Sequence, residues 1–110
     1  MDLKSAVFPT QGIKLFFVDN QQEIARIWIY IISNSLHKKP YALIEDLLVQ
    51  EEYRGKGIGT KMVQAAIEEA RKLGCYKILA TSRHTRPEVH QLYLQWGFKE
   101  WGKEFRMDLS

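Results

Sequence analysis

Three glycines at alternate positions, Gly55, Gly57 and Gly59, are interleaved with the cationic side chains of Arg54 and Lys56. Glycine adopts tight backbone conformations that expose N–H groups, so such a segment can surround an anion. An amphipathic segment follows at once, and the start of a helix contributes unpaired N–H groups and the positive end of its dipole. The spacing therefore predicts a phosphate-binding loop at the junction between a strand and a helix.

The order of residues in this loop excludes two common phosphate sites. A P-loop requires Gly-Lys followed by Ser or Thr, whereas this chain has Gly59-Thr60-Lys61. A dinucleotide fingerprint requires a third glycine three residues after the second, which this loop lacks. No group of His and Cys residues has the spacing of a metal site, so we expect no bound metal. A glycine-rich turn with solvated charges is the alternative interpretation of the loop.

Two adjacent carboxylates, Glu45 and Asp46, interrupt the otherwise apolar segment Tyr41–Val49. Strict alternation predicts two apolar faces, with Tyr41, Leu43, Leu47 and Val49 on one and Ala42, Ile44 and Leu48 on the other. A strand that is apolar on both faces is expected to be central and covered on both sides. Because a buried carboxylate without a partner is costly, each must be paired or must face a wet cleft. For Asp46 we expect an ion pair with an arginine such as Arg26, whereas Glu45 is a candidate for function.

The elements that must position these residues form a mixed sheet with helices packed on it, an α/β fold of the α+β mixed-sheet kind. Apolar, β-prone runs predict a hairpin, two further strands and a C-terminal strand, at Ile13–Asp19, Ile24–Ser33, Tyr41–Val49, Tyr76–Thr81 and residues 101–109. Helices are predicted from residue 57 to 73, ended by Gly74, and from a capping box at Thr85–Glu88 to Gly97. The unit from Tyr41 to Thr81 predicts a right-handed crossover between parallel strands.

Length and composition limit the classes of protein to which the chain can belong. The chain has 110 residues, enough for a single domain over residues 1–110, with 45% hydrophobic and 26% charged residues. A net charge of +3 from scattered basic residues suits a small anionic ligand and forms no nucleic-acid patch. Cys75 is the single cysteine and no long apolar stretch occurs, so we expect a cytoplasmic protein with no membrane span.

Two motifs in the chain resemble signatures of the GNAT superfamily of N-acetyltransferases. The loop resembles its Arg/Gln-x-x-Gly-x-Gly/Ala signature, and Leu92-Tyr93-Leu94-Gln95-Trp96-Gly97-Phe98 is similar to its Leu-Tyr-x-x-x-Gly-Phe. Both occur in the expected order, and the resemblance extends from about Ile13 to the C-terminus. It implies that the loop wraps the diphosphate of acetyl-CoA, with the cosubstrate held by Leu47, Leu48, Val49, Arg54, Gly55, Lys56, Gly57, Ile58, Gly59 and Thr60.

The resemblance also implies acetyl transfer to a primary amine, with Glu45 and Tyr93 as the catalytic residues. The run Ile44-Glu45-Asp46 is similar to the polyamine acetyltransferase branch, in which the matching glutamate removes the amine proton directly or through water. A glutamate of ordinary acidity accepts that proton poorly, and burial predicts a stronger base. Backbone N–H groups around Leu47–Val49 are implied to stabilise charge on the carbonyl oxygen. Tyr93 is implied to protonate or hydrogen-bond the leaving sulfur, and an ordinary core tyrosine is the alternative.

Members of this superfamily begin with a strand and two helices that form one wall of the acceptor site, and here only about a dozen residues precede the first predicted strand. We therefore expect an acceptor cleft that is open or completed by another chain, and exposed apolar surface that favours a homodimer. Two hypotheses remain open. One is an enzyme that acts on a small amine, a polyamine or a protein amine, and the other is a catalytically weak module that binds coenzyme A or assembles with a partner.

Overall fold

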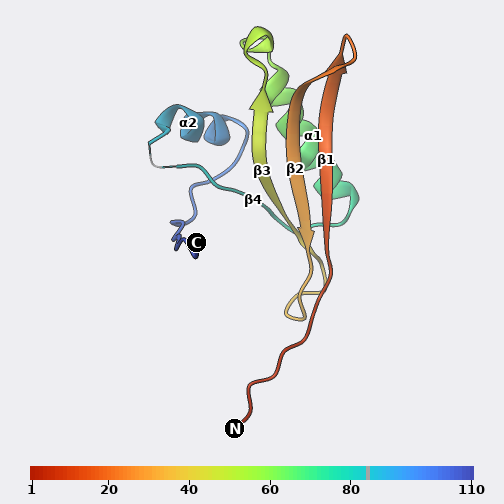
Figure 1. Cartoon of the computed structure of the whole chain (residues 1–110), viewed down its shortest axis with the longest axis vertical. Coiled ribbons are helices and arrows are strands. Elements are labelled where there is room, and N and C mark those ends of the chain that lie inside the picture. The colour runs from red at the N-terminus through yellow and green to blue at the C-terminus, as the bar shows by residue number, and fades with distance from the viewer. Residues whose placement is uncertain (84) are drawn as a thin grey trace. The chain divides into compact units, whose positions relative to one another are not determined.

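A computed structural model describes residues 1–83 and 85–110, in two compact units, Met1–Ala80 and Thr81–Ser110. Each unit is described by itself. The first contains a four-stranded mixed sheet in the order β1-β2-β3-β4, with one α-helix against it (Figure 1). Its elements are β1 (Thr10–Asp19), β2 (Gln22–Ile32), β3 (Tyr41–Val49), the 3₁₀ turn η1 (Glu51–Tyr53), α1 (Ile58–Lys72) and β4 (Ile78–Ala80). The mixed sheet and the order of its elements confirm the predicted fold class.

The predicted hairpin is formed by β1 and β2, which are antiparallel over their whole length, from the pair Thr10↔Ile32 to the pair Asp19↔Gln22. Two residues, Asn20 and Gln21, connect the strands, and both have positive φ angles, of 50° and 64°. Two successive residues with positive φ are the signature of a type I′ turn, whose twist matches that of the flanking strands. The polar run after Asp19 therefore forms the tightest of the common hairpin turns.

The hydrophobic core lies between α1 and one face of the sheet. From α1 it contains Met62, Val63, Ala66 and Ala70, and from the strands Ile24, Ala25, Ile27, Ile29, Ile31, Ala42 and Ile44. Residues directly opposite in an antiparallel ladder share a face, and the pairs Ile29↔Ile44 and Ile31↔Ala42 place these strand residues together. Within this unit α1 covers one face only, so the expectation that β3 is covered on both sides is not met there.

A β-bulge in β3 changes which residues face α1. The ladder with β2 runs through Trp28↔Glu45 and then Arg26↔Leu48, so two residues of β3, Asp46 and Leu47, lie opposite Ile27 alone. Asp46 has a positive φ of 55°, which Asp and Asn adopt more readily than other side chains.

The bulge overturns the face that strict alternation assigns to the end of β3. Val49 pairs with Ala25 and lies on the face that α1 covers, with Ala42 and Ile44. The prediction that Val49 shares a face with Tyr41 and Leu43 is therefore wrong, because one extra residue shifts the alternation.

The predicted parallel pairing across α1 is confirmed, although β4 is shorter than the run Tyr76–Thr81. The ladder between β3 and β4 contains the pairs Ala42↔Ile78, Leu43↔Leu79 and Ile44↔Ala80, and it ends there. β3 continues to Val49, so its second half has no partner in β4.

Gly74 ends α1 in the way the sequence predicts. It has a positive φ of 77°, and its N–H donates to the carbonyl of Arg71 at 3.0 Å. The N–H of Cys75 donates to the carbonyl of Ala70, also at 3.0 Å. These two hydrogen bonds form a Schellman motif, which satisfies carbonyls that the helix end leaves without partners.

The second unit contains α2 (Pro87–Gln95), and two predictions for this unit are wrong. The predicted capping box is absent: the N-cap is Arg86 and not Thr85, and no side chain caps the helix. Pro87 follows at the first helical position, where its missing N–H costs nothing. The expected C-terminal strand is also absent from the described chain, and residues 101–110 have no ladder partner and are exposed. Gly97, with a φ of 98°, ends the helix as predicted.

Candidate functional site

The glycine loop joins η1 to α1 and has left-handed backbone at two of its three glycines. Gly55 and Gly57 have φ angles of 76° and 79°, and a Cβ added to either would meet nothing within 4 Å. These glycines are therefore required by backbone conformation and not by packing. Gly59 has no positive φ, and a Cβ there would lie 3.9 Å from Cγ2 of Val49, which is an ordinary contact. This difference explains why a signature of this kind accepts alanine at the third glycine position.

Gly57 is also the N-cap of α1, and no side chain caps this end of the helix. The N–H of Lys61 donates to the carbonyl of Gly57 at 3.1 Å, which begins the helical ladder. The N–H groups of Ile58 and Gly59 precede that bond and have no acceptor four residues back within the helix. The loop therefore directs backbone donors and the positive end of the helix dipole to one place.

Side-chain and backbone bonds hold the loop against the end of β3. Nε of Arg54 donates to the carbonyl of Val49 at 2.9 Å, and the N–H of Gln50 donates to the carbonyl of Ile24 at 2.8 Å. The side chain of Arg54 thus ties the start of the loop to the last residue of β3. The ammonium of Lys56 lies 5.4 Å from the ring centre of Tyr53, which leaves it exposed beside the loop.

A hydrogen bond that we did not predict ties η1, the turn that precedes the loop, to the first hairpin. The hydroxyl of Tyr53 donates to Oδ2 of Asp19 at 2.6 Å. This bond raises the pKa of Tyr53 above its usual value of 10.0, and desolvation and the charges of Asp19 and Glu52 raise it further. The pair of Tyr53 and Asp19 could be found only from the register of the hairpin, because that register brings the hairpin turn to the end of β3.

Tyr53→Phe should lower the stability of the fold, and the loss should depend on pH. The pKa of Tyr53 is raised in the folded state, so the stabilisation is fully present below about pH 10 and is lost as the pH rises through the folded value. Unfolding in urea, measured at a series of pH values, should show the wild type and Tyr53→Phe converging at high pH. Tyr76→Phe is the control, since the Tyr76 hydroxyl has no hydrogen bond in the described chain. A difference between wild type and Tyr53→Phe that stays constant at all pH values would contradict this assignment.

The two carboxylates of β3 are both exposed, so the burial that was expected for Glu45 is not found. The bulge bends the strand at this point. α1 packs against the other face of the sheet and does not cover Glu45. Arg26 forms an ion pair with Glu23 at 3.9 Å, and no ion pair of Asp46 is found among the described residues. The expected pairing of Asp46 with Arg26 is therefore wrong as well, and Asp46 serves the bulge through its positive φ.

Tyr93 lies in the second unit, on α2, and the structure accounts for its spacing from Gly97 and Phe98. The N–H of Gly97 donates to the carbonyl of Leu94 at 3.1 Å, and the N–H of Phe98 donates to the carbonyl of Tyr93 at 3.0 Å. The rings of Tyr93 and Phe98 pack edge to face at 5.3 Å. This is a complete Schellman motif with its apolar contact. The spacing is thus required by the helix cap and does not by itself favour a catalytic role.

The Tyr93 side chain is half-buried, and desolvation raises the pKa of its phenol above 10.0. The Trp96 ring lies 5.5 Å away at 90°, so two aromatic rings surround the phenol. At neutral pH the hydroxyl is therefore protonated and can act as a hydrogen-bond donor.

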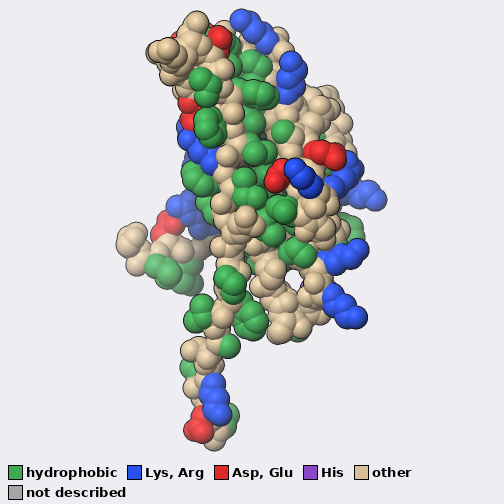
Figure 2. Space-filling view, turned by 90° about the vertical axis from the view of Figure 1, so that its right-hand side faces the viewer, with side chains coloured by type: hydrophobic (Ala, Val, Ile, Leu, Met, Phe, Trp, Pro, Cys, Tyr) green, Lys and Arg blue, Asp and Glu red, His purple; other side chains and the backbone are tan. Residues whose placement is uncertain are grey.

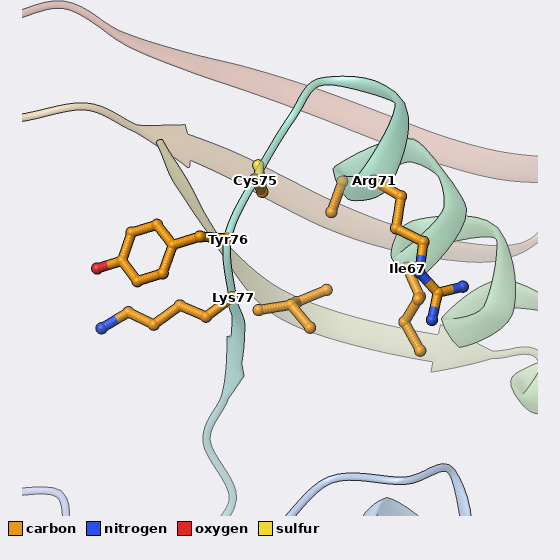
Figure 3. A pocket seen from close by; sticks show the side chains of 7 residues that line it. Ile67, Arg71, Cys75, Tyr76 and Lys77 are labelled. Atoms are coloured by element: carbon orange, nitrogen blue, oxygen red, sulfur yellow. The ribbon is translucent and has the colours of Figure 1, made fainter. Parts of the chain in front are cut away.

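A shallow hollow of about 180 Å³ lies away from the loop, between the C-terminal half of α1 and the segment that leads into β4 (Figure 3). Ile67 and Arg71 line it from the helix, and Cys75, Tyr76 and Lys77 from the segment. Desolvation raises the pKa of the Cys75 thiol, which makes it a poorer nucleophile and agrees with its interpretation as a packing residue.

The described residues contain no group of three or more His, Cys, Asp or Glu side chains able to hold a metal ion. None of their helices is long and apolar enough to cross a membrane.

On the face shown in Figure 2, hydrophobic side chains are exposed in a band, and lysine and arginine side chains gather toward its right-hand margin.

Comparisons with known proteins show which proteins this chain is similar to. The family model described as the acetyltransferase (GNAT) family matches residues 6–98. An aminoglycoside N(6′)-acetyltransferase type 1 from Acinetobacter genomosp. 13 is 30% identical over 95 residues, which are 83% of this chain and 65% of that protein. Glucosamine 6-phosphate N-acetyltransferase 1 from Oryza sativa subsp. japonica is 37% identical over 57 residues, 52% of this chain and 33% of the relative.

A solved structure of an acetyltransferase from Trypanosoma brucei superposes with a TM-score of 0.81, at 24% identity, over 89% of this chain and 69% of that one. This likeness concerns the fold. The matched segment spans about a third of the length of the rice relative. Because the family model covers most of the chain, including the glycine loop and the Tyr93 helix, the chain belongs to the acetyltransferase (GNAT) family.

Proposed function

We propose that the chain binds acetyl-CoA at the glycine loop and transfers its acetyl group to a primary amine. The observation that carries this proposal is the left-handed backbone at Gly55 and Gly57, directly before an uncapped helix N-terminus. Together they present backbone N–H donors beside the cationic side chains of Arg54 and Lys56. This set of donors fits a diphosphate, which carries several acceptor oxygens and negative charge.

The remaining contacts to the cosubstrate would come from the end of β3 and the first turn of α1. Past Ile44 the β3 edge has no partner in β4, so the backbone of Leu47, Leu48 and Val49 is available to an extended ligand. Ile58, Gly59 and Thr60 would lie against the diphosphate with the loop glycines. Acetyl-CoA supplies an acyl group activated as a thioester. N–H groups of Leu47–Val49 would stabilise negative charge on its carbonyl oxygen.

The protein must remove a proton from its acceptor. An alkyl ammonium with a pKa near ~10 is deprotonated about once in 10³ at neutral pH, an obstacle of roughly 4 kcal/mol. We assign this step to Glu45, which is exposed beside the unpaired part of β3 and can pass the proton to water.

Tyr93 would donate a hydrogen bond to the sulfur as negative charge develops there. A thiol has a pKa of about 8.5, below that of the half-buried phenol, so full proton transfer from Tyr93 would be uphill. Donation without transfer stabilises the thiolate and keeps the phenol intact.

Among the acceptors considered, we favour a small amine, because relatives of this chain are named as glucosamine 6-phosphate and aminoglycoside acetyltransferases. A polyamine or a protein amine is the alternative class. We also propose a cytoplasmic homodimer, on the basis of a lone cysteine and of exposed apolar side chains such as Phe16 and Leu79.

A catalytically weak module that binds coenzyme A is the second candidate function. The complete helix cap at Tyr93 favours it, because the cap alone explains the motif that contains the tyrosine. Transfer of radiolabelled acetyl groups to a panel of amines, with calorimetric titration of coenzyme A, separates the two. Binding without turnover on any amine supports the module, and absence of binding contradicts both.

Tyr93→Phe tests the role of the hydroxyl, because it keeps the ring that packs on Phe98. We expect kcat to fall about tenfold, the loss of one hydrogen bond to a developing charge, with both KM values unchanged. Steady-state kinetics on the best amine of the panel gives these values. Thermal unfolding should show an intact cap, and an unchanged kcat would reduce Tyr93 to a packing residue.

A further inference from the structure

The sheet face opposite α1 places an aromatic pair beside Glu45. The ladders align three residues across β1, β2 and β3, Lys14↔Trp28↔Glu45, so their side chains emerge on one face. Opposite residues in such ladders have Cβ atoms about 5 Å apart. Trp28 and Glu45 are therefore immediate neighbours on the face that α1 leaves uncovered.

Trp28 and Tyr30 form a stacked aromatic pair on this face. Their ring centres are 6.3 Å apart and the ring planes differ by 11°. Gly12, the β1 partner of Tyr30, makes room for the tyrosine ring: a Cβ at Gly12 would lie 3.4 Å from Cε1 of Tyr30. Both residues are half-buried, so part of each side chain stays accessible. We refer to Trp28 and Tyr30 as the aromatic platform.

The charges around the platform are already paired except at one position. Glu23 of β2 forms ion pairs with Lys14 of β1 and with Arg26 of its own strand. No ion pair of Glu45 is found in the described chain, and its carboxylate is exposed. The platform is therefore bordered by one carboxylate that is available to a cation.

We propose that the aromatic platform binds the ring of the acceptor, with the acceptor's ammonium group held between Glu45 and the indole of Trp28. This inference rests on the proposed function and narrows it to amines carried on a saturated ring, such as amino sugars. The C–H groups of such a ring pack on flat aromatic faces, and an ammonium near an indole gains a cation–π attraction. An open-chain amine would contact the carboxylate but would leave most of the platform uncovered.

The test compares a ring-bearing probe, glucosamine, with an open-chain probe, ethanolamine, in transfer assays and in calorimetric binding. For glucosamine, Trp28→Leu should raise KM about tenfold, with kcat and the KM for acetyl-CoA within about twofold. Trp28→Phe should recover most of the loss because it restores an aromatic face. For ethanolamine, Trp28→Leu should change KM less than threefold, since only the ammonium contact is affected.

Phe16→Leu is the matched control, because Phe16 is an exposed aromatic residue on the same face but its ladder partner is Arg26. It should leave KM for glucosamine unchanged. An equal effect of Phe16→Leu and Trp28→Leu, or no effect of Trp28→Leu, overturns the platform while leaving acetyl transfer intact.

If the wild type transfers no acetyl group to either probe, the proposed function fails. The calorimetric titration then tests separately whether the platform binds glucosamine. Binding of glucosamine that Trp28→Leu weakens about tenfold supports it. Absence of glucosamine binding to the wild type, or binding that Trp28→Leu does not change, overturns it.

Discussion

Glu45→Gln is expected to lower kcat by about 10² to 10⁴-fold at neutral pH, the usual contribution of a general base. Glutamine keeps the size of the side chain and its place beside Trp28, but it cannot accept a proton. The effect should shrink as the pH approaches about 10, because the amine then loses its proton without help. A pH–rate profile of the wild type and of Glu45→Gln on the same amine measures this.

Asp46→Asn is the matched control for Glu45→Gln. Asp46 is also exposed and adjacent in sequence, and asparagine tolerates the positive φ of 55° that the bulge requires. We expect its kcat to stay within about twofold of the wild type, since the proposed proton transfer assigns no role to the Asp46 carboxylate. A loss in Glu45→Gln that is equal at all pH values, or that appears in KM alone, would show that Glu45 binds the amine without deprotonating it.

Gly57→Val is expected to weaken coenzyme A binding about 100-fold, equivalent to roughly 3 kcal/mol. Valine cannot adopt a φ of 79° without strain, so the loop must follow another path, and the N–H groups of Gly57 and Ile58 turn away from the diphosphate. Isothermal titration of coenzyme A measures the change. Gly59→Ala should bind within about threefold of the wild type, because its Cβ makes an ordinary contact with Val49.

Gly74→Val separates backbone strain from loss of the site. Gly74 has a φ of 77° and open space around its Cβ position, which nearly duplicates the environment of Gly57. Both variants should lose a similar amount of stability, about 1–2 kcal/mol, in urea unfolding. Only Gly57→Val should lose affinity for coenzyme A. Equal binding losses in the two variants would place the diphosphate elsewhere.

The parts of the fold that the sequence predicted well are those fixed by local rules. The strand Tyr41–Val49 and the helix that Gly74 ends depend on apolar periodicity and on a residue able to adopt positive φ. The glycine loop was found for the same reason, since its backbone conformation is specified by residue type at successive positions.

The predictions that failed depend on partners distant in the sequence. The bulge at Asp46 follows from the pairing of β3 with β2, so no pattern within β3 reveals it. The C-terminal segment alternates as a strand does, but a strand exists only where a neighbour completes its ladder. Thr85 is not the N-cap because Pro87 keeps the preceding residue, Arg86, out of the helical conformation, so the helix begins one residue later than expected.

The candidate site was predictable in part for the same reasons. Its backbone half, the loop and the end of β3, was found from the glycines and the apolar strand. The sequence did not predict the Tyr53–Asp19 bond or the neighbours of Glu45 on β2. Both depend on how β1, β2 and β3 are aligned with one another, which no single segment reveals. The Tyr93 motif was located correctly, but the spacing of its residues is explained by the helix cap.

The single extra residue at the bulge has a consequence for how chains of this kind can vary in length. Ile44 and Val49 both face α1 although five positions separate them, whereas their partners Ile29 and Ala25 on β2 are four positions apart. Removing the extra residue would leave both side chains directed at α1, because a regular strand returns to the same face after four positions. Related chains that conserve this core should therefore have either this bulge or a regular strand that is one residue shorter.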